Sequence, residues 1–104
     1  MEQYEVVISE PAETDLDGIA DYIATQLSSP MSSINVVEAI ENSVMSLSHM
    51  PHRYALVDDE HLAAMCYRKV PVKNYIVFFT IDEDAGVVNI ERILYGRRDW
   101  LHIL

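Results

Sequence analysis

Two amphipathic helical patterns, separated by only about three residues, constrain the fold of this chain most. Within residues 12–27 and again within residues 30–50, apolar residues recur at steps of three and four. The stripe residues are Leu16, Ile19, Ala20, Ile23 and Leu27 in the first stretch, and Ile34, Val37, Ile40, Val44 and Leu47 in the second. This spacing places the apolar side chains on one face of each helix. Because consecutive helices with a short connection lie antiparallel, the sequence predicts a helical hairpin.

Proline and serine residues mark where the two helices begin and end. Pro11 lies at the predicted start of the first helix, where its missing N–H costs nothing. Ser29 followed by Pro30 predicts a cap and a first position for the second helix. A residue before proline is pushed out of the α region, so the second helix should end near Met50, before Pro51.

Runs of β-branched and aromatic residues flank the helical hairpin. The runs are Tyr4–Ser9 before it and His61–Val72, Asn74–Ile81 and Val87–Tyr95 after it. Their composition is typical of strands, and the acidic segment 82–86 predicts a hairpin loop between the last two. Pro71 predicts an end or a bend in the strand that contains it. The run 75–81 is apolar on both parities, which is typical of a central strand covered on both sides.

The order β-α-α-β-β-β predicts a single two-layer α+β domain over residues 1–104. Both helical stripes should cover one face of a mostly antiparallel sheet, which contains the N-terminal strand and about three further strands. We expect the opposite face to meet solvent or a partner. The last residues, "RRDWLHIL", could add one short helical turn.

The charge distribution concentrates the candidate functional residues in the second half of the chain. The net charge is −10, which argues against general adhesion to nucleic acid, because Lys and Arg carry sequence-independent phosphate binding. Residues 1–52 contain nine acidic residues and no Lys or Arg, whereas residues 53–104 hold all seven basic residues. No export signal or membrane-length apolar run is seen, and Cys66 cannot form an internal disulfide. We expect a cytoplasmic protein with no membrane segment, and no ligand spacing predicts a metal or cofactor.

Four arginines form the candidate site. Arg68 and Arg92 lie within predicted strands, and Arg97 and Arg98 follow the last one. In one interpretation, Arg68, Arg92 and one of the last two converge on the exposed sheet face and bind phosphate or carboxylate bidentately. In the other, each arginine pairs with a carboxylate. The available carboxylates are Glu60, Asp82, Glu91 and Asp99.

Aromatic residues and one histidine lie among these arginines. The aromatic residues are Tyr67, Tyr75, Tyr95 and Trp100. They could stack on nucleobases, and the alternative is that they only fill the sheet. His102 could accept a proton near neutral pH, and the alternative is an exposed histidine on a terminal turn. The acidic residues predicted to form a solvated face of the first helix are Asp15, Asp17 and Asp21.

In their order and spacing these segments resemble the RelE/ParE superfamily, small toxins of bacterial type II toxin–antitoxin systems that are also described as plasmid stabilisation proteins. The similarity rests on "YEVVISEPAETDLDGIADYI", "SP", "SLSHMPHR" and the tail "YRKVPVKNYIVFFTID…VVNIERILYGRRDW". It implies the same strand, helical hairpin and antiparallel sheet. It also implies a cognate antitoxin that forms a hetero-oligomer with the chain, with a homodimer as the alternative state of the free chain.

The superfamily contains two kinds of toxin. RelE-like members cut messenger RNA in the ribosomal A site, whereas ParE-like members poison DNA gyrase and are not enzymes. The resemblance implies that Arg68, Tyr95 and Arg97 would be catalytic in an RNA-cleaving member, with Arg98 and His102 as lesser candidates. There the 2′-hydroxyl attacks the phosphate, the arginines neutralise the intermediate and a Tyr or His moves protons.

The resemblance also bears on the choice of target. The residues expected to contact the target or nucleic acid are Arg68, Arg92, Arg97 and Arg98. The lysine-rich segment of RelE-like members is missing, since residues 53–67 contain only Arg53 as a basic residue. Gyrase inhibition is therefore slightly favoured. Ribosome-dependent cleavage is the alternative, and an inactive binding module of the same fold is a third reading.

Overall fold

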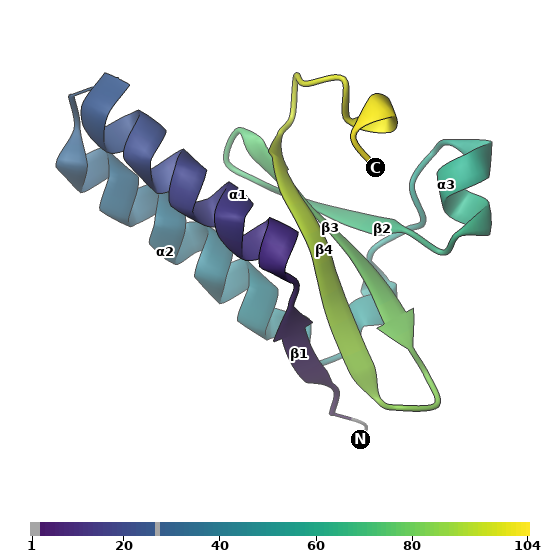
Figure 1. Ribbon diagram of the computed structural model, residues 1–104. Coiled ribbons are helices and arrows are strands. Elements are labelled where there is room, and N and C mark those ends of the chain that lie inside the picture. The colour runs from purple at the N-terminus through teal and green to yellow at the C-terminus, as the bar shows by residue number, and fades with distance from the viewer. Residues whose placement is uncertain (1–2, 27) are drawn as a thin grey trace.

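The computed structural model describes residues 3–26 and 28–104 (Figure 1). The helices are α1 (Glu10–Asp21), α2 (Pro30–Ser46) and α3 (Glu60–Ala64), and the strands are β1 (Glu5–Ile8), β2 (Arg68–Val72), β3 (Tyr75–Asp82) and β4 (Val87–Tyr95). A π-helical segment, Tyr22–Gln26, continues α1, and two 3₁₀ turns cover Pro51–Arg53 and Trp100–His102. The predicted strand, helical hairpin and following sheet are confirmed. None of the described helices combines the length and apolar character needed to cross a bilayer.

The helical hairpin is fixed at both of its starts by serine caps. The Ser9 hydroxyl accepts a hydrogen bond from the backbone N–H of Ala12 and donates one to the carbonyl of Glu91, so the cap also ties α1 to β4. With Ser9 as the cap, α1 starts at Glu10, two residues before the predicted start. Ser29 caps α2 as predicted, with Pro30 in the first position. Leu27, the last predicted stripe residue of the first helix, lies outside the described residues.

The second helix ends earlier than the predicted boundary near Met50. It ends at Ser46, and the carbonyl of Ser48 then accepts the backbone N–H of Tyr4 at 2.8 Å. His49 forms an isolated bridge with Gln3. The backbone that could have continued the helix therefore pairs with the N-terminal segment instead.

The sheet has the strand order β1-β4-β3-β2, and it is mostly antiparallel as predicted. β1 runs parallel to β4, with Val7 opposite Asn89, whereas β4, β3 and β2 are joined antiparallel. A bulge interrupts β4 at Glu91, because Arg92 pairs with Phe78 and Ile90 pairs with Phe79. Glu91 therefore has no opposite residue in the strand register, although its carboxylate accepts a hydrogen bond from the Thr80 hydroxyl on β3. Figure 1 shows the helical hairpin along one side of this sheet.

The main core lies between the sheet and the helical hairpin. Its buried residues are Tyr4, Ala12, Ile19, Ile23, Ile40, Val44, Leu47, Val70, Val77, Phe79, Val88, Ile90 and Ile93. From the predicted second stripe, Ile40, Val44 and Leu47 are buried, but Ile34 is 53% exposed. The stripe therefore packs only through its C-terminal part, and the N-terminal half of α2 leaves apolar surface uncovered.

The opposite face of the sheet carries a second core, although we had expected that face to meet solvent or a partner. This core confirms the prediction that the run 75–81 is a central strand covered on both sides. Val57, Leu62, Phe78 and Leu94 are buried there, and Tyr67, Ile76, Trp100, Ile103 and Leu104 pack against them. Residues 61–64, which were predicted to begin a strand, belong instead to helix α3, and this helix supplies Leu62. The Asp59 carboxylate caps that helix by accepting from the N–H of Leu62, and left-handed Cys66 then reverses the chain.

Pro71 lies inside β2, which ends at Val72, one residue beyond the position where the sequence predicted an end or a bend. Pro71 pairs with Ile76 on β3, and β2 is an edge strand. On the outer edge of β2, the carbonyl of Tyr67 accepts the N–H of Val57. Backbone groups alternate in direction along a strand, so every second residue counted from Tyr67 points its N–H and carbonyl away from β3. Pro71 is one of these residues, and its missing N–H therefore removes no bond to β3.

Candidate functional site

The C-terminal turn after β4 projects two arginines from the domain. The N–H of Gly96 donates to the carbonyl of Asn74 at 2.8 Å, and a Cβ at Gly96 would approach that carbonyl to 3.3 Å. This close approach explains the glycine. The N–H of Arg98 then donates to the carbonyl of Tyr95, which closes the turn. Arg97, Arg98 and Asp99 are all exposed.

The tail beyond this turn is anchored on the second core. The ring of Trp100 packs on Phe78, with 5.2 Å between ring centroids, and the Lys69 ammonium lies 5.5 Å from the Trp100 ring centroid. The predicted terminal helical turn is present at Trp100–His102. Because Trp100 is held by packing, it is not free to stack on a base, and the anchored tail fixes the place of the exposed arginines.

The acidic residue of the turn binds a histidine instead of an arginine. Asp99 Oδ2 and His102 Nδ1 are 2.6 Å apart, and both side chains are well exposed. Among the residues that the structure describes, no carboxylate forms an ion pair with Arg97 or Arg98. The predicted pairing of these arginines with Asp99 is therefore not observed, and both guanidinium groups face solvent.

Arg92 is paired, but with a carboxylate from the helical hairpin. Its Nε and Nη2 donate to the two carboxylate oxygens of Asp15 at 2.7 and 2.8 Å, and the backbone N–H of Ile93 donates to the same carboxylate at 3.0 Å. The side chain of Asp15 is only 11% exposed, so its predicted place on a solvated face is wrong. These bonds to Asp15 raise the pKa of Arg92.

The predicted convergence of Arg68 and Arg92 on one exposed sheet face is also wrong. Arg68 pairs with Phe79, whose ring lies in the core under the helices, whereas Arg92 pairs with Phe78 in the second core. The two arginines therefore stand on opposite faces. Arg68 donates from Nη1 to the carbonyl of Tyr54 at 2.7 Å, and it is partly buried. Neither arginine can share a single phosphate with the other.

The tyrosines near the end of β4 form a small aromatic group. Tyr75 and Tyr95 lie opposite each other on β3 and β4 and meet edge to face at 5.7 Å between ring centroids. Burial, followed by the nearby Tyr22 and Tyr95 hydroxyls, raises the pKa of Tyr75. Tyr67 lies on the other face, where burial and then Glu91 raise its pKa. Tyr95 remains 39% exposed, two residues from Arg97.

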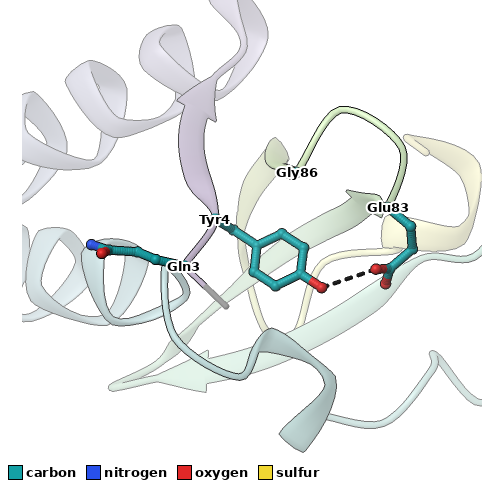
Figure 2. A pocket seen from close by; sticks show the side chains of 4 residues that line it. All are labelled: Gln3, Tyr4, Glu83 and Gly86. Atoms are coloured by element: carbon teal, nitrogen blue, oxygen red, sulfur yellow. Dashed lines mark hydrogen bonds between the residues drawn. The ribbon is translucent and has the colours of Figure 1, made fainter. Parts of the chain in front are cut away.

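A second polar cluster, which the sequence did not predict, lies at the other end of β3. The Tyr4 hydroxyl donates to Glu83 Oε2 at 2.9 Å, and His52 Nε2 contacts Glu83 Oε1. Gln3, Tyr4, Glu83 and Gly86 line a hollow of about 310 Å³. Figure 2 shows these residues and the hydrogen bond between Tyr4 and Glu83. The Tyr4 hydrogen bond, helped by His52, lowers the pKa of Glu83. Tyr4, His52 and Glu83 lie far apart in the sequence, so no local sequence motif could have predicted that they form a cluster.

The cluster fastens three segments of the fold to one another. Tyr4 precedes β1, His52 follows α2, and Glu83 begins the β3–β4 loop. The rings of Tyr4 and His52 also meet edge to face at 6.0 Å. Across the described part of the chain, no group of three or more His, Cys, Asp or Glu side chains is placed to hold a metal ion.

Comparison with known proteins identifies one family and several structural neighbours. The family model of the ParE toxin of the type II toxin–antitoxin system parDE matches residues 6–100. No functionally curated protein matches the chain.

The structural neighbours are toxins and toxin–antitoxin complexes. The chromosomal ParDE system of P. aeruginosa aligns with a TM-score of 0.73 and 20% identity, covering 89% of this chain and 96% of that one. The RelBE2 toxin–antitoxin complex of Mycobacterium tuberculosis aligns with a TM-score of 0.65 and 19% identity, covering 89% and 98%. A free-state mutant of the E. coli toxin RelE gives 0.66 and 10%, covering 97% and 92%. At identities this low, the structural alignments show that these proteins share the fold of the chain.

Proposed function

Because the chain belongs to the ParE toxin family of type II toxin–antitoxin systems, we propose that it arrests bacterial growth by inhibiting DNA gyrase and that its projecting C-terminal turn makes the contact. In this proposal the protein is an inhibitor without catalytic residues. It acts in the cytoplasm, where gyrase works, and a cognate antitoxin neutralises it by forming a hetero-oligomer with it.

One observation carries the choice of target, namely the different states of the four candidate arginines. Arg92 is held by Asp15, and Arg68 is bound to a backbone carbonyl on the opposite face of the sheet. Arg97 and Arg98 are exposed on a turn whose position is fixed by the anchored tail. This arrangement supports recognition of a surface by two adjacent guanidinium groups, which bind carboxylates or phosphates in a fork geometry. It offers little support for several arginines around one reacting phosphate.

Ribosome-dependent cleavage of messenger RNA is the second candidate, and the position of Tyr95 favours it. Tyr95 is partly exposed and lies two residues before Arg97, so a hydroxyl and a guanidinium could meet one nucleotide at the end of β4. In that case Arg97 would stabilise the charge that develops on the phosphate, and Tyr95 would take part in proton transfer. His102 is the weaker candidate, because its ring contacts the Asp99 carboxylate and lies well exposed to solvent.

The two targets are separated by assays of the purified protein. Gyrase with plasmid DNA should accumulate cleaved DNA or lose supercoiling activity when the protein is added, and messenger RNA on programmed ribosomes should stay intact. The double substitution Arg97→Ala and Arg98→Ala should abolish the effect on gyrase. Arg53→Gln serves as the control and should retain the effect on gyrase. It removes one exposed basic group from a different part of the fold, where Arg53 donates to the carbonyl of Met50, so its folding is checked by circular dichroism first.

Cleaved messenger RNA with unaffected gyrase would transfer the assignment to the second candidate. Tyr95→Phe would then be expected to slow the cleavage. A protein that affects neither target but binds its antitoxin would be an inactive binding module of the same fold.

A further inference from the structure

The outer face of α2 carries a stripe that no part of the described chain covers. Its residues follow steps of three and four along the helix: Met31, Ile34, Glu38, Glu41 and Met45. All five are exposed, and the three apolar members are between 53% and 68% accessible. Residues at this spacing lie on one side of a helix, and this side is roughly 110° around α2 from the side that buries Ile40 and Val44 in the core.

The stripe has the dimensions and the spacing of a helix-pairing seam. From Met31 to Met45 it extends roughly 20 Å, which is about four helical turns. Apolar residues spaced by three and four are those with which helices pack against one another. Figure 1 shows α2 lying beside α1 along its length. The stripe therefore lies on a helix whose position is already fixed by its packing.

The two central residues of the stripe decide which partner fits. Glu38 and Glu41 form no ion pair within the described residues, and the first 52 residues contain no Lys or Arg that could neutralise them. A second copy of this chain would place Glu38 against Glu38 in either orientation, because Glu38 is the centre of the stripe. Like charges in the middle of a helical seam oppose association. A partner with basic residues at these positions would form complementary pairs.

We propose that the outer stripe of α2 binds a cationic amphipathic helix of a partner protein. That helix presents apolar residues to Met31, Ile34 and Met45 and Lys or Arg to Glu38 and Glu41. The adaptable side chains of the two methionines suit such an interface. Naming this partner as the antitoxin rests on the proposed function, whereas the chemistry of the docking surface does not.

Two synthetic helical peptides of about 20 residues, long enough to span the stripe, test the chemistry. Both carry leucines at the apolar positions; one has lysines at the two central positions and the other has glutamates. Calorimetry on the whole protein should show at least about tenfold tighter binding of the lysine peptide. In the double substitution Glu38→Lys and Glu41→Lys the preference should reverse. Equal affinity for the two peptides, or no binding of either, overturns the proposal.

A matched control and a dimerisation test separate docking on this stripe from general charge attraction and from self-association. Glu13→Lys with Asp17→Lys changes the net charge by the same amount on exposed sites of α1, and it should keep the wild-type preference. If this control loses the preference as well, the attraction is a general charge effect and the proposal fails. Self-association of the wild-type chain that Ile34→Asp abolishes would identify a second copy as the occupant and would also overturn it.

A growth assay tests whether the partner is the antitoxin. The double substitution Glu38→Lys and Glu41→Lys should remain toxic but should no longer be neutralised by the product of the neighbouring reading frame. Unchanged neutralisation would remove the antitoxin as the partner of this stripe. Absence of toxicity in the wild-type chain would contradict the proposed function instead, and the peptide measurements would still stand.

Discussion

Replacing Asp15 with alanine removes the carboxylate through which the helical hairpin holds the end of β4. This carboxylate accepts two hydrogen bonds from the Arg92 guanidinium and one from the N–H of Ile93. Asp15→Ala therefore leaves the Arg92 side chain, which is 27% exposed, without its partner and leaves a backbone donor without an acceptor. We expect the fold to lose stability and the helical hairpin to separate more readily from the sheet.

The size of the loss follows from the burial of the pair. Breaking a fully buried ion pair costs about 3–5 kcal/mol, and an unsatisfied buried donor costs about 1–3 kcal/mol. Arg92 retains access to water, which recovers part of its solvation, so we expect the free energy of unfolding to fall by about 2–3 kcal/mol. For a domain of this size that loss corresponds to a decrease of roughly 10 °C in Tm.

Urea unfolding of the variant and of two companions measures the effect. Asp17→Ala is the control, because Asp17 is exposed on the same helix and should change the free energy of unfolding by no more than about 0.5 kcal/mol. A double-mutant cycle of Asp15→Ala with Arg92→Ala should give a coupling energy of about 1–2 kcal/mol. A loss at Asp15 that equals the loss at Asp17, or a coupling energy near zero, would refute the reasoning.

Two further substitutions test the second core and the polar cluster. Trp100→Ala removes the ring that packs on Phe78, and urea unfolding should show a loss of about 2 kcal/mol, with faster proteolysis of the tail; a tail cleaved no faster than in wild type would contradict this anchor. Tyr4→Phe removes the main cause of the low pKa of Glu83. A lowered carboxyl pKa stabilises the fold above the ordinary glutamate pKa, about 4.3, and the benefit disappears as pH falls through the folded value. The stability difference between wild type and Tyr4→Phe should therefore be larger at pH 7 than at pH 3, and a difference independent of pH would argue against the role of this hydrogen bond.

Local patterns were sufficient to predict the helical hairpin and the antiparallel strands. Caps, helix periodicity and the acidic loop act over a few residues, and they predicted the start of α2 and the hairpin between β3 and β4 correctly. The predicted strand over His61–Val72 was correct for its second part, which is β2, and wrong for its first part, which is in helix α3. Local sequence also explains this error. The first part contains Leu and Ala, which favour helix, and the Asp59 cap that fixes the helix start lies just outside the run.

Side-chain partners between distant segments could not be predicted. Asp15 had the position of a solvated residue on an amphipathic helix, and only the packing of α1 against β4 brings it to Arg92. The bulge at Glu91 and the bond of Arg68 to Tyr54 likewise depend on how strands pair, and these separate two arginines that were predicted to converge. The exposed pair Arg97 and Arg98 is the part of the predicted site whose placement followed from local sequence, because Gly96 permits the turn.

Induction of this chain in a bacterium, alone and together with the neighbouring reading frame, is the most direct test of its assignment as a toxin. We predict that the chain alone stops growth and that co-expression of the neighbouring product restores it. Arg97→Ala with Arg98→Ala should allow growth without the partner, provided that the variant accumulates to the same level as the wild type. Unaffected growth when the wild-type chain is produced alone, at a level confirmed by immunoblotting, would contradict the account.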